Sequence, residues 1–286
     1  NPDKKAGNPT EMRGAWISTV YNLDWPSEES YENIAEQKQE FEQILDELQD
    51  MGINTVFVQV RPAGDALYPS DLVPWSKYLT GTQGKDPGYD PLAFMIEAAR
   101  ERDMDIHAWF NPFRANTSSK REDLAPNHVV HAHPEWIIEA ENKLFIDPGI
   151  PAARQHIIDA IMEVVERYDI DGVHLDDYFY PPHADFPDDA SYAAYNPNGL
   201  DRGDWRRSNI NDFVQRLGAA IKKVKPEAQF GISPFGVWRN KDVDPTGSDT
   251  RAYANTYDDM FADVRTWIKQ GWVDYIMPQI YWSMSL

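Results

Sequence analysis

The sequence contains no cysteine, which excludes disulfide bonds, thiolate metal ligands and cysteine nucleophiles. No apolar run reaches the length of about 18 residues that a membrane-spanning helix needs, so no transmembrane segment is expected. Lys and Arg are nowhere clustered, and 27 of them stand against 47 Asp and Glu, giving a formal net charge of −20. Because binding a polyphosphate requires clustered positive charge, nucleic acid is not expected as a partner.

What is present is typical of a folded α/β protein. The 286 residues are 42% hydrophobic and 26% charged, enough for one large domain. Ten tryptophans raise the aromatic content to 13%, which indicates either flat faces for stacking a ligand or a rich core. Residues 1–10 are polar and contain Pro and Gly, so we expect a flexible lead-in, from which a signal peptide could have been removed, followed by one domain over 11–286.

Short apolar strands alternate with amphipathic helices along the chain. The pattern predicts strands at 13–18, 55–60, 106–110, 172–176, 229–233 and 275–281. Helices are expected at 31–51, 91–102, 152–168, 205–224 and 258–270. Within the excursion 111–149, residues 135–139 and 143–146 flank a polar turn and could form a β-hairpin.

This alternation predicts a parallel sheet, either open and doubly wound or closed as a (β/α)₈ barrel of the TIM type. The loops after the strands are long and rich in aromatic residues, whereas the connections from helix to strand are short. That asymmetry favours the barrel, whose active sites lie in the loops after the strands, and no Gly-rich phosphate loop follows the first strand. Only six of the eight strands of such a barrel are found, so we expect a barrel truncated after the sixth strand.

The clearest chemical signal is the acidic doublet Asp176–Asp177, at the end of the fourth strand in the run DGVHLDDYFYP over 171–181. Buried carboxylates at a strand end are costly unless they serve a purpose, and glycoside hydrolysis needs two carboxyl groups. Strand alternation predicts that His174 and Asp176 face the barrel axis, with Asp177 on the other face. The alternative is that the pair caps the strand and binds an arginine, or that Asp177 only orients its neighbour.

Other strand ends carry polar and aromatic candidates for substrate binding. Gln59 and Arg61 should share a face, with Arg61 pairing either a ligand carboxylate or Asp176. After the third strand, Asn111 could hydrogen-bond a sugar hydroxyl and Trp109 could stack, although a proline turn with core aromatics explains them as well. The remaining candidates near strand ends are Arg114, Tyr178, Trp238, Gln279, Tyr281 and Trp282. The histidines at 128, 131 and 133 show no zinc-site pattern, so neither a metal nor another cofactor is expected.

Taken together, these segments resemble the glycosyl-hydrolase-like 10 family. The matching motifs span 13–16, 59–62, 64–68, 107–112, 147–149, 171–181, 205–207, 233–236 and 278–282. The resemblance implies a secreted or lipid-anchored, extracytoplasmic bacterial protein that cleaves the glycan strands of peptidoglycan, including peptide-free strands. It also places the catalytic acid at Asp176 or Asp177, and a muramyl carboxylate near Arg61.

The sequence departs from the better-known barrel glycosidases, which carry Asn-Glu after the fourth strand and a second Glu after the seventh. Here the fourth strand ends in Asp-Asp, so the second carboxylate stays unassigned. Retention or inversion of configuration then depends on a carboxyl separation of about 5.5 Å or about 6.5–9.5 Å. Two alternative functions stay open: a non-catalytic glycan-binding barrel, and a hydrolase of another polysaccharide.

Overall fold

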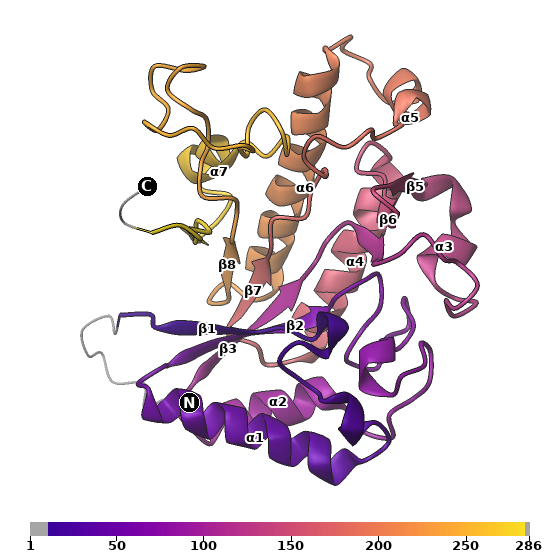
Figure 1. Ribbon diagram of the computed structural model, residues 1–286, viewed down its shortest axis with the longest axis vertical. Coiled ribbons are helices and arrows are strands. Elements are labelled where there is room, and N and C mark those ends of the chain that lie inside the picture. Colours follow the sequence, from indigo (N-terminus) through magenta and orange to yellow (C-terminus); the bar gives the residue numbers. More distant parts are fainter. Residues whose placement is uncertain (1–10, 284–286) are drawn as a thin grey trace.

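The computed structural model describes residues 11–283, so the predicted lead-in at 1–10 lies outside the described residues. The main sheet has six parallel strands in the order β1-β2-β3-β7-β8-β9. They are β1 Gly14–Ile17, β2 Thr55–Arg61, β3 Asp105–Phe110, β7 Gly172–Leu175, β8 Gln229–Ile232 and β9 Tyr275–Ile276. The sheet is curled into a half-barrel, which agrees with the predicted α/β class and truncated barrel (Figure 1).

Helices cover the outer side of this sheet, α1 and α2 next to β1 and β3, and α4 and α6 along β7 and β8 (Figure 1). The α-helices are α1 Ile34–Asp50, α2 Pro91–Arg100, α3 Val129–Ala132, α4 Pro151–Arg167, α5 Asp189–Ala194, α6 Arg202–Val224 and α7 Val264–Gln270. Short 3₁₀ helices are η1 Val20–Asn22, η2 Glu28–Ser30, η3 Lys77–Leu79 and η4 Pro134–Trp136. Among residues 11–283, none of the helices is long and apolar enough to cross a membrane.

The strand sequences explain the packing of the sheet. All seven residues of β2 are buried, as expected for a β-branched, apolar strand covered on both faces. In the interior, rings lie across glycines: a Cβ on Gly231 would stand 2.0 Å from the ring of Tyr275, and one on Gly172 would stand 2.5 Å from the ring of His107. Glycine is therefore required at both positions for these aromatic side chains to fill the half-barrel.

Most predicted elements are found. The structure adds one strand that was not predicted, and the last helix and the last strand are shorter than expected. The expected hairpin is present as β5 Ile137–Ala140 and β6 Lys143–Ile146, and a third strand, β4 Arg114–Asn116, joins β6. The last helix begins six residues later than expected, because the side chain of Asp263 accepts a hydrogen bond from the Thr266 amide and caps it there. The last strand pairs regularly over only two residues, although the amides of Met277 and Gln279 still donate to the carbonyl oxygens of Ile232 and Pro234, each at 2.9 Å.

A buried ion-pair cluster secures the excursion between β7 and α6. The Asp188 side chain is fully buried, and both Nε and Nη2 of Arg206 donate to it at 2.8 Å, while Arg202 also pairs with it. Replacing Asp188 by Ala would leave the Arg206 guanidinium without its counter-charge and Arg202 with only the exposed Asp189. We expect the free energy of unfolding to fall by about 3–5 kcal/mol, measured by urea denaturation.

Asp189 offers a matched control for this substitution. It also pairs with Arg202, but its side chain is 86% exposed. Asp189→Ala should change the free energy of unfolding by less than about 1 kcal/mol, because exposed ion pairs contribute little. Equal losses in the two variants would show that burial of the carboxylate is not what makes Asp188 important.

Candidate active site

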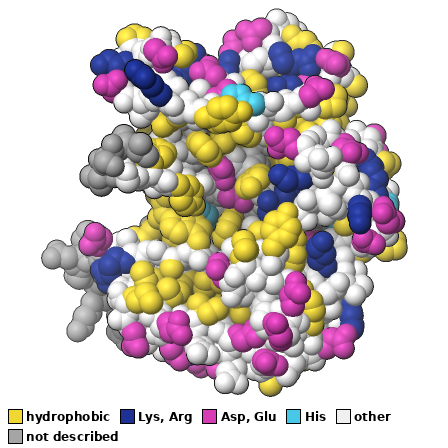
Figure 2. Space-filling view, viewed as in Figure 1, with side chains coloured by type: hydrophobic (Ala, Val, Ile, Leu, Met, Phe, Trp, Pro, Cys, Tyr) yellow, Lys and Arg dark blue, Asp and Glu magenta, His cyan; other side chains and the backbone are white. Residues whose placement is uncertain are grey.

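The carboxyl ends of the six strands surround a cleft of about 640 Å³, seen as a hollow in the middle of the molecule (Figure 2). Each strand supplies side chains to it or is followed by residues that do. The lining residues are Trp16, Ser18, Val20, Tyr21, Leu23, Gln59, Trp109, Arg114, His174, Asp176, Asp177, Tyr178, Ser233, Met277, Pro278, Gln279, Ile280 and Tyr281. The loops after parallel strands thus form the cleft, as the loop asymmetry of the sequence predicts.

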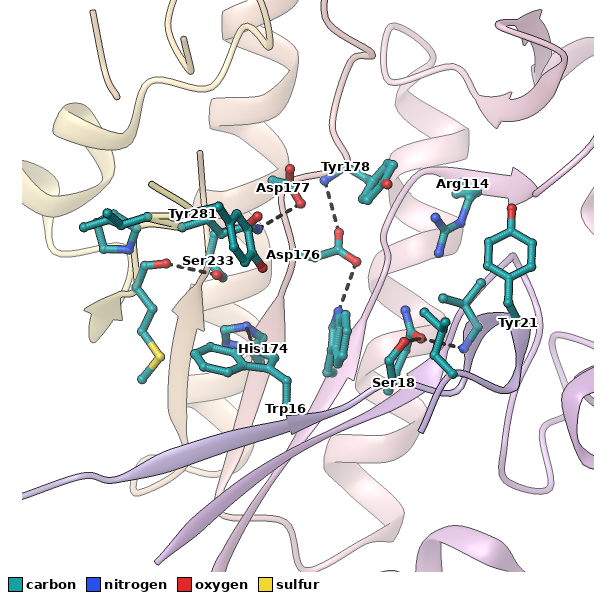
Figure 3. A pocket seen from close by; sticks show the side chains of 18 residues that line it. Trp16, Ser18, Tyr21, Arg114, His174, Asp176, Asp177, Tyr178, Ser233 and Tyr281 are labelled. Atoms are coloured by element: carbon teal, nitrogen blue, oxygen red, sulfur yellow. Dashed lines mark hydrogen bonds between the residues drawn. The ribbon is translucent and has the colours of Figure 1, made fainter. Parts of the chain in front are cut away.

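Asp176 stands in the centre of the cleft, directly after β7 (Figure 3). Only 5% of the residue is exposed. Its Oδ1 accepts a hydrogen bond from the Tyr178 amide at 3.1 Å, and its Oδ2 accepts one from Nε1 of Trp109 at 3.0 Å. Burial, followed by the negative charge of Asp177, raises the pKa of Asp176 to about 7, although Arg114 and both hydrogen bonds act in the opposite direction.

Asp177 lines the same cleft, so the expectation that it lies on the opposite face is wrong. The reason is that β7 ends at Leu175, and strand alternation does not extend past that residue. The Asp177 Oδ1 accepts a hydrogen bond from Nε2 of Gln279 at 3.0 Å. Burial raises the pKa of Asp177, while Gln279 and Arg114 favour its ionised form. The negative charge of Asp177 in turn contributes to the raised pKa of Asp176, so the two carboxyl groups titrate as a coupled pair.

A chain of neutral aromatic groups forms the floor beneath the acidic pair. Nε1 of Trp16 donates to Nε2 of His174 at 3.0 Å, so the His174 proton lies on Nδ1, which is 3.1 Å from the Tyr275 hydroxyl. That hydroxyl in turn is free to donate to Nδ1 of His107 at 2.8 Å. Burial lowers the pKa of His174 to about 3, so the floor carries no charge at neutral pH.

Gln59 and Arg114 also reach the cleft, as the sequence predicts. The Oε1 of Gln59 accepts hydrogen bonds from the amides of Thr19 and Val20, at 3.1 and 2.9 Å. Gln59 therefore fixes the segment after β1 that carries Tyr21 and Leu23 to the rim. Arg114 lies with its guanidinium 4.7 Å from the centre of the Tyr178 ring.

Arg61 does not line the cleft, so the prediction that it binds a ligand there is wrong. A bulge in β2 pairs Gln59 with Trp109 but Arg61 with Phe110, whose side chain is buried in the core. Arg61 consequently faces the helical layer, fully buried, near Asp65 and Glu163, and its guanidinium has no hydrogen-bond partner among residues 11–283. The prediction that Gln59 and Arg61 share a face is wrong for this reason.

Three further candidates lie outside the cleft. Asn111 is buried, and its Oδ1 accepts the Arg114 amide in a tight turn, so it positions Arg114 rather than contacting the cleft. The Trp238 ring is covered by the Arg265 guanidinium at 3.6 Å. Trp282 packs over Gly236 and lines a separate groove with residues of the 237–252 loop.

Several lining residues were not among the sequence candidates, chiefly Trp16, Tyr21, Ser233 and Met277. Trp16 carried a usable signal, because it stands at the end of the first strand in the Arg-Gly-Ala-Trp run. It is 41% exposed and its ring stacks on Phe57 at 4.8 Å, which leaves a supported aromatic face at the cleft. Within the described range 11–283, no group of three or more His, Asp or Glu residues is placed to hold a metal ion.

Comparison with known proteins gives consistent results. The family model described as Glycosyl hydrolase-like 10 matches residues 11–286. Glycosyl hydrolase YngK of Bacillus subtilis (strain 168) is 51% identical over 285 residues, covering 98% of this chain and 56% of that protein. Glycosyl hydrolase DigH of Escherichia coli (strain K12) is 44% identical over 292 residues, covering 96% and 66%. The chain thus spans between half and two thirds of the length of these relatives.

Among solved structures, α-L-fucosidase isoenzyme 2 from Paenibacillus thiaminolyticus is similar, with a TM-score of 0.55 and 17% identity. The match covers 83% of this chain and 34% of the fucosidase chain. At this identity the likeness concerns the fold alone, and it agrees with the curled parallel sheet described above.

Proposed function

The chain belongs to the glycosyl hydrolase-like 10 family, and from this premise we propose that it hydrolyses glycosidic bonds with Asp176 as the general acid. Family membership supports a glycoside-hydrolase type of function. The observation that carries the proposal is the carboxyl group of Asp176, which burial and the adjacent charge of Asp177 hold protonated near neutral pH within an open cleft.

Breaking a glycosidic bond requires a proton for the leaving oxygen and negative charge near the anomeric carbon. The protonated Asp176 supplies the proton, because its pKa of about 7 matches what an acid needs near neutrality. The Trp109 N–H fixes one oxygen of Asp176 and the Tyr178 amide the other, which aims the carboxyl group. Asp177, oriented by Gln279, supplies the second carboxylate, which stabilises the positive charge that develops at the anomeric carbon as the bond breaks and water replaces the leaving oxygen.

For the substrate, we propose the glycan strands of peptidoglycan, with or without their peptides. The supported ring of Trp16 and the exposed rings of Tyr21, Tyr178 and Tyr281 offer flat faces on which sugar rings stack, as expected for a polysaccharide cleft. A cell-wall substrate would place the protein outside the cytoplasmic membrane.

The test is incubation of the protein with purified glycan strands, both intact and peptide-free, followed by mass spectrometry of the products. The proposal expects new reducing ends from at least one of these substrates. Binding without cleavage would instead support a non-catalytic glycan-binding barrel. Cleavage confined to other polysaccharides, offered in parallel, would support a hydrolase of different specificity.

The pH dependence of hydrolysis gives an independent check on Asp176. We expect kcat/KM to decline above about pH 7 as Asp176 loses its proton. In Trp109→Phe the N–H that stabilises the ionised form is lost, so the pKa of Asp176 should rise and the decline should move up by about one pH unit. Trp16→Phe is the matched control, because that indole binds His174, and its profile should keep the wild-type midpoint. Equal midpoints in all three proteins would remove Asp176 as the titrating acid.

A further inference from the structure

Arg114 is the one Lys or Arg among the described residues that line the cleft. It begins β4, and its guanidinium extends into the space between Asp176 and Tyr21 (Figure 3). The chain as a whole has a formal net charge of −20 and would repel an acidic ligand at long range. A single cation inside the cleft of so acidic a protein is therefore a specific feature of this site.

The side chain is held at its base and along one face. Nε donates to the Pro62 carbonyl oxygen at 3.0 Å, the backbone amide donates to Asn111 at 3.0 Å, and the guanidinium lies over the Tyr178 ring. These contacts determine the direction in which the guanidinium points. They leave Nη1 and Nη2 unused.

The two terminal nitrogens make no hydrogen bond or ion pair with any residue of 11–283, and neither is sealed from the cleft. Other partly buried arginines of this chain do have partners: Arg206 and Arg239 each donate to a carboxylate at 2.8 Å. Withdrawing a guanidinium from water costs free energy unless a counter-ion or another acceptor binds its N–H groups.

Asp176 and Asp177 do not serve as the counter-ion of the Arg114 guanidinium. Arg114 lies near enough to lower the pKa of both Asp176 and Asp177, yet it donates to neither. The Asp176 oxygens bind Trp109 and the Tyr178 amide, and Asp177 binds Gln279. Two parallel N–H donors of a guanidinium match the two oxygens of a carboxylate.

From these observations we propose that Arg114 binds a carboxylate on a sugar unit of the substrate, so that the cleft selects acidic glycans over neutral ones. The inference rests on the proposed function and specifies the substrate class of the same site. It also transfers to Arg114 the carboxylate-binding role that the sequence alone suggested for Arg61.

The experiment compares peptide-free glycan strands with the same strands after chemical reduction of their carboxylates to alcohols. For the wild type, reduction should lower kcat/KM by about 10- to 100-fold, as for loss of a hydrogen-bonded charge. Arg114→Gln should hydrolyse the two substrates at similar rates, so that the ratio of their kcat/KM values falls to about one. Using the ratio between the substrates cancels any effect of Arg114 on the titration of the acidic pair.

Lys223→Gln, which removes one exposed positive charge from α6, is the matched control and should keep the wild-type ratio. A wild-type ratio near one would overturn the inference, and so would an undiminished ratio in Arg114→Gln, while hydrolysis itself would still support the proposed function. Calorimetric binding of the two substrates serves as a second readout. This readout also applies if the protein hydrolyses neither substrate. Tighter binding of the unreduced strands that is lost in Arg114→Gln would support the inference, and equal affinity of the wild type for both kinds of strand would overturn it.

Discussion

Replacing Asp176 by Asn is expected to lower kcat on glycan strands by about 10²–10⁴-fold, the usual contribution of a general acid. Asn keeps an oxygen that accepts from Trp109 or the Tyr178 amide, so the geometry of the cleft should persist. What it lacks is the proton that the leaving oxygen needs. The Kd for the glycan should therefore stay close to that of the wild type, and single-turnover assays with calorimetry would measure both quantities.

Asp147 offers a matched control for this loss. It too is a buried carboxyl group whose pKa is raised by burial, but it bonds the Gly149 amide and does not line the cleft. Asp147→Asn should retain kcat within about a factor of a few, since no proton transfer is assigned to it. If Asp176→Asn lost no more activity than Asp147→Asn, the acid would have to be another group, with Asp177 the next candidate.

Much of the fold could be predicted because its physical causes are local in the sequence. The continuous apolar run of β2 and the long loops after each strand indicate buried parallel strands with the site at their carboxyl ends. The placement of Asp176, Gln279 and Tyr281 at the cleft follows from the same rule. The hairpin of β5 and β6 could be predicted from the polar two-residue turn that joins the two strands.

The errors concern features that depend on pairing between strands far apart in the chain. Nothing in the residues around Arg61 shows that a bulge will pair it with Phe110 and turn it toward the helices. Likewise, Asp177 reaches the cleft because β7 stops at Leu175, one residue earlier than the apolar pattern indicates. Arg114 was correctly predicted near the cleft, but the sequence does not show the turn in which the Asn111 side chain binds the Arg114 amide.

Asp176→Asn should also stabilise the protein at alkaline pH, by up to about 4 kcal/mol at pH 8. The pKa of Asp176 is raised from 3.8 to about 7 in the folded state, a difference of about three pH units at about 1.4 kcal/mol each. Below about pH 4 the group is protonated whether folded or unfolded, so wild type and variant should be equally stable there. Between about pH 4 and pH 7 the wild type loses this stability, because the unfolded chain ionises at Asp176 while the folded state resists ionisation, and above about pH 7 the loss is complete. Asn cannot ionise and keeps its stability over the same range.

Urea denaturation of both proteins at pH 4 and pH 8 measures this difference, with Asp123→Asn as a control for the same change of charge at an exposed position. The control should leave the free energy of unfolding nearly unchanged at both pH values. Parallel pH dependence of wild type and Asp176→Asn would mean that the carboxyl group is hydrated, and the argument for a neutral acid would fail with it. The burial that keeps Asp176 protonated for catalysis also destabilises its ionised form. A proton donor that works near pH 7 is therefore obtained at the expense of stability at every pH above about 4.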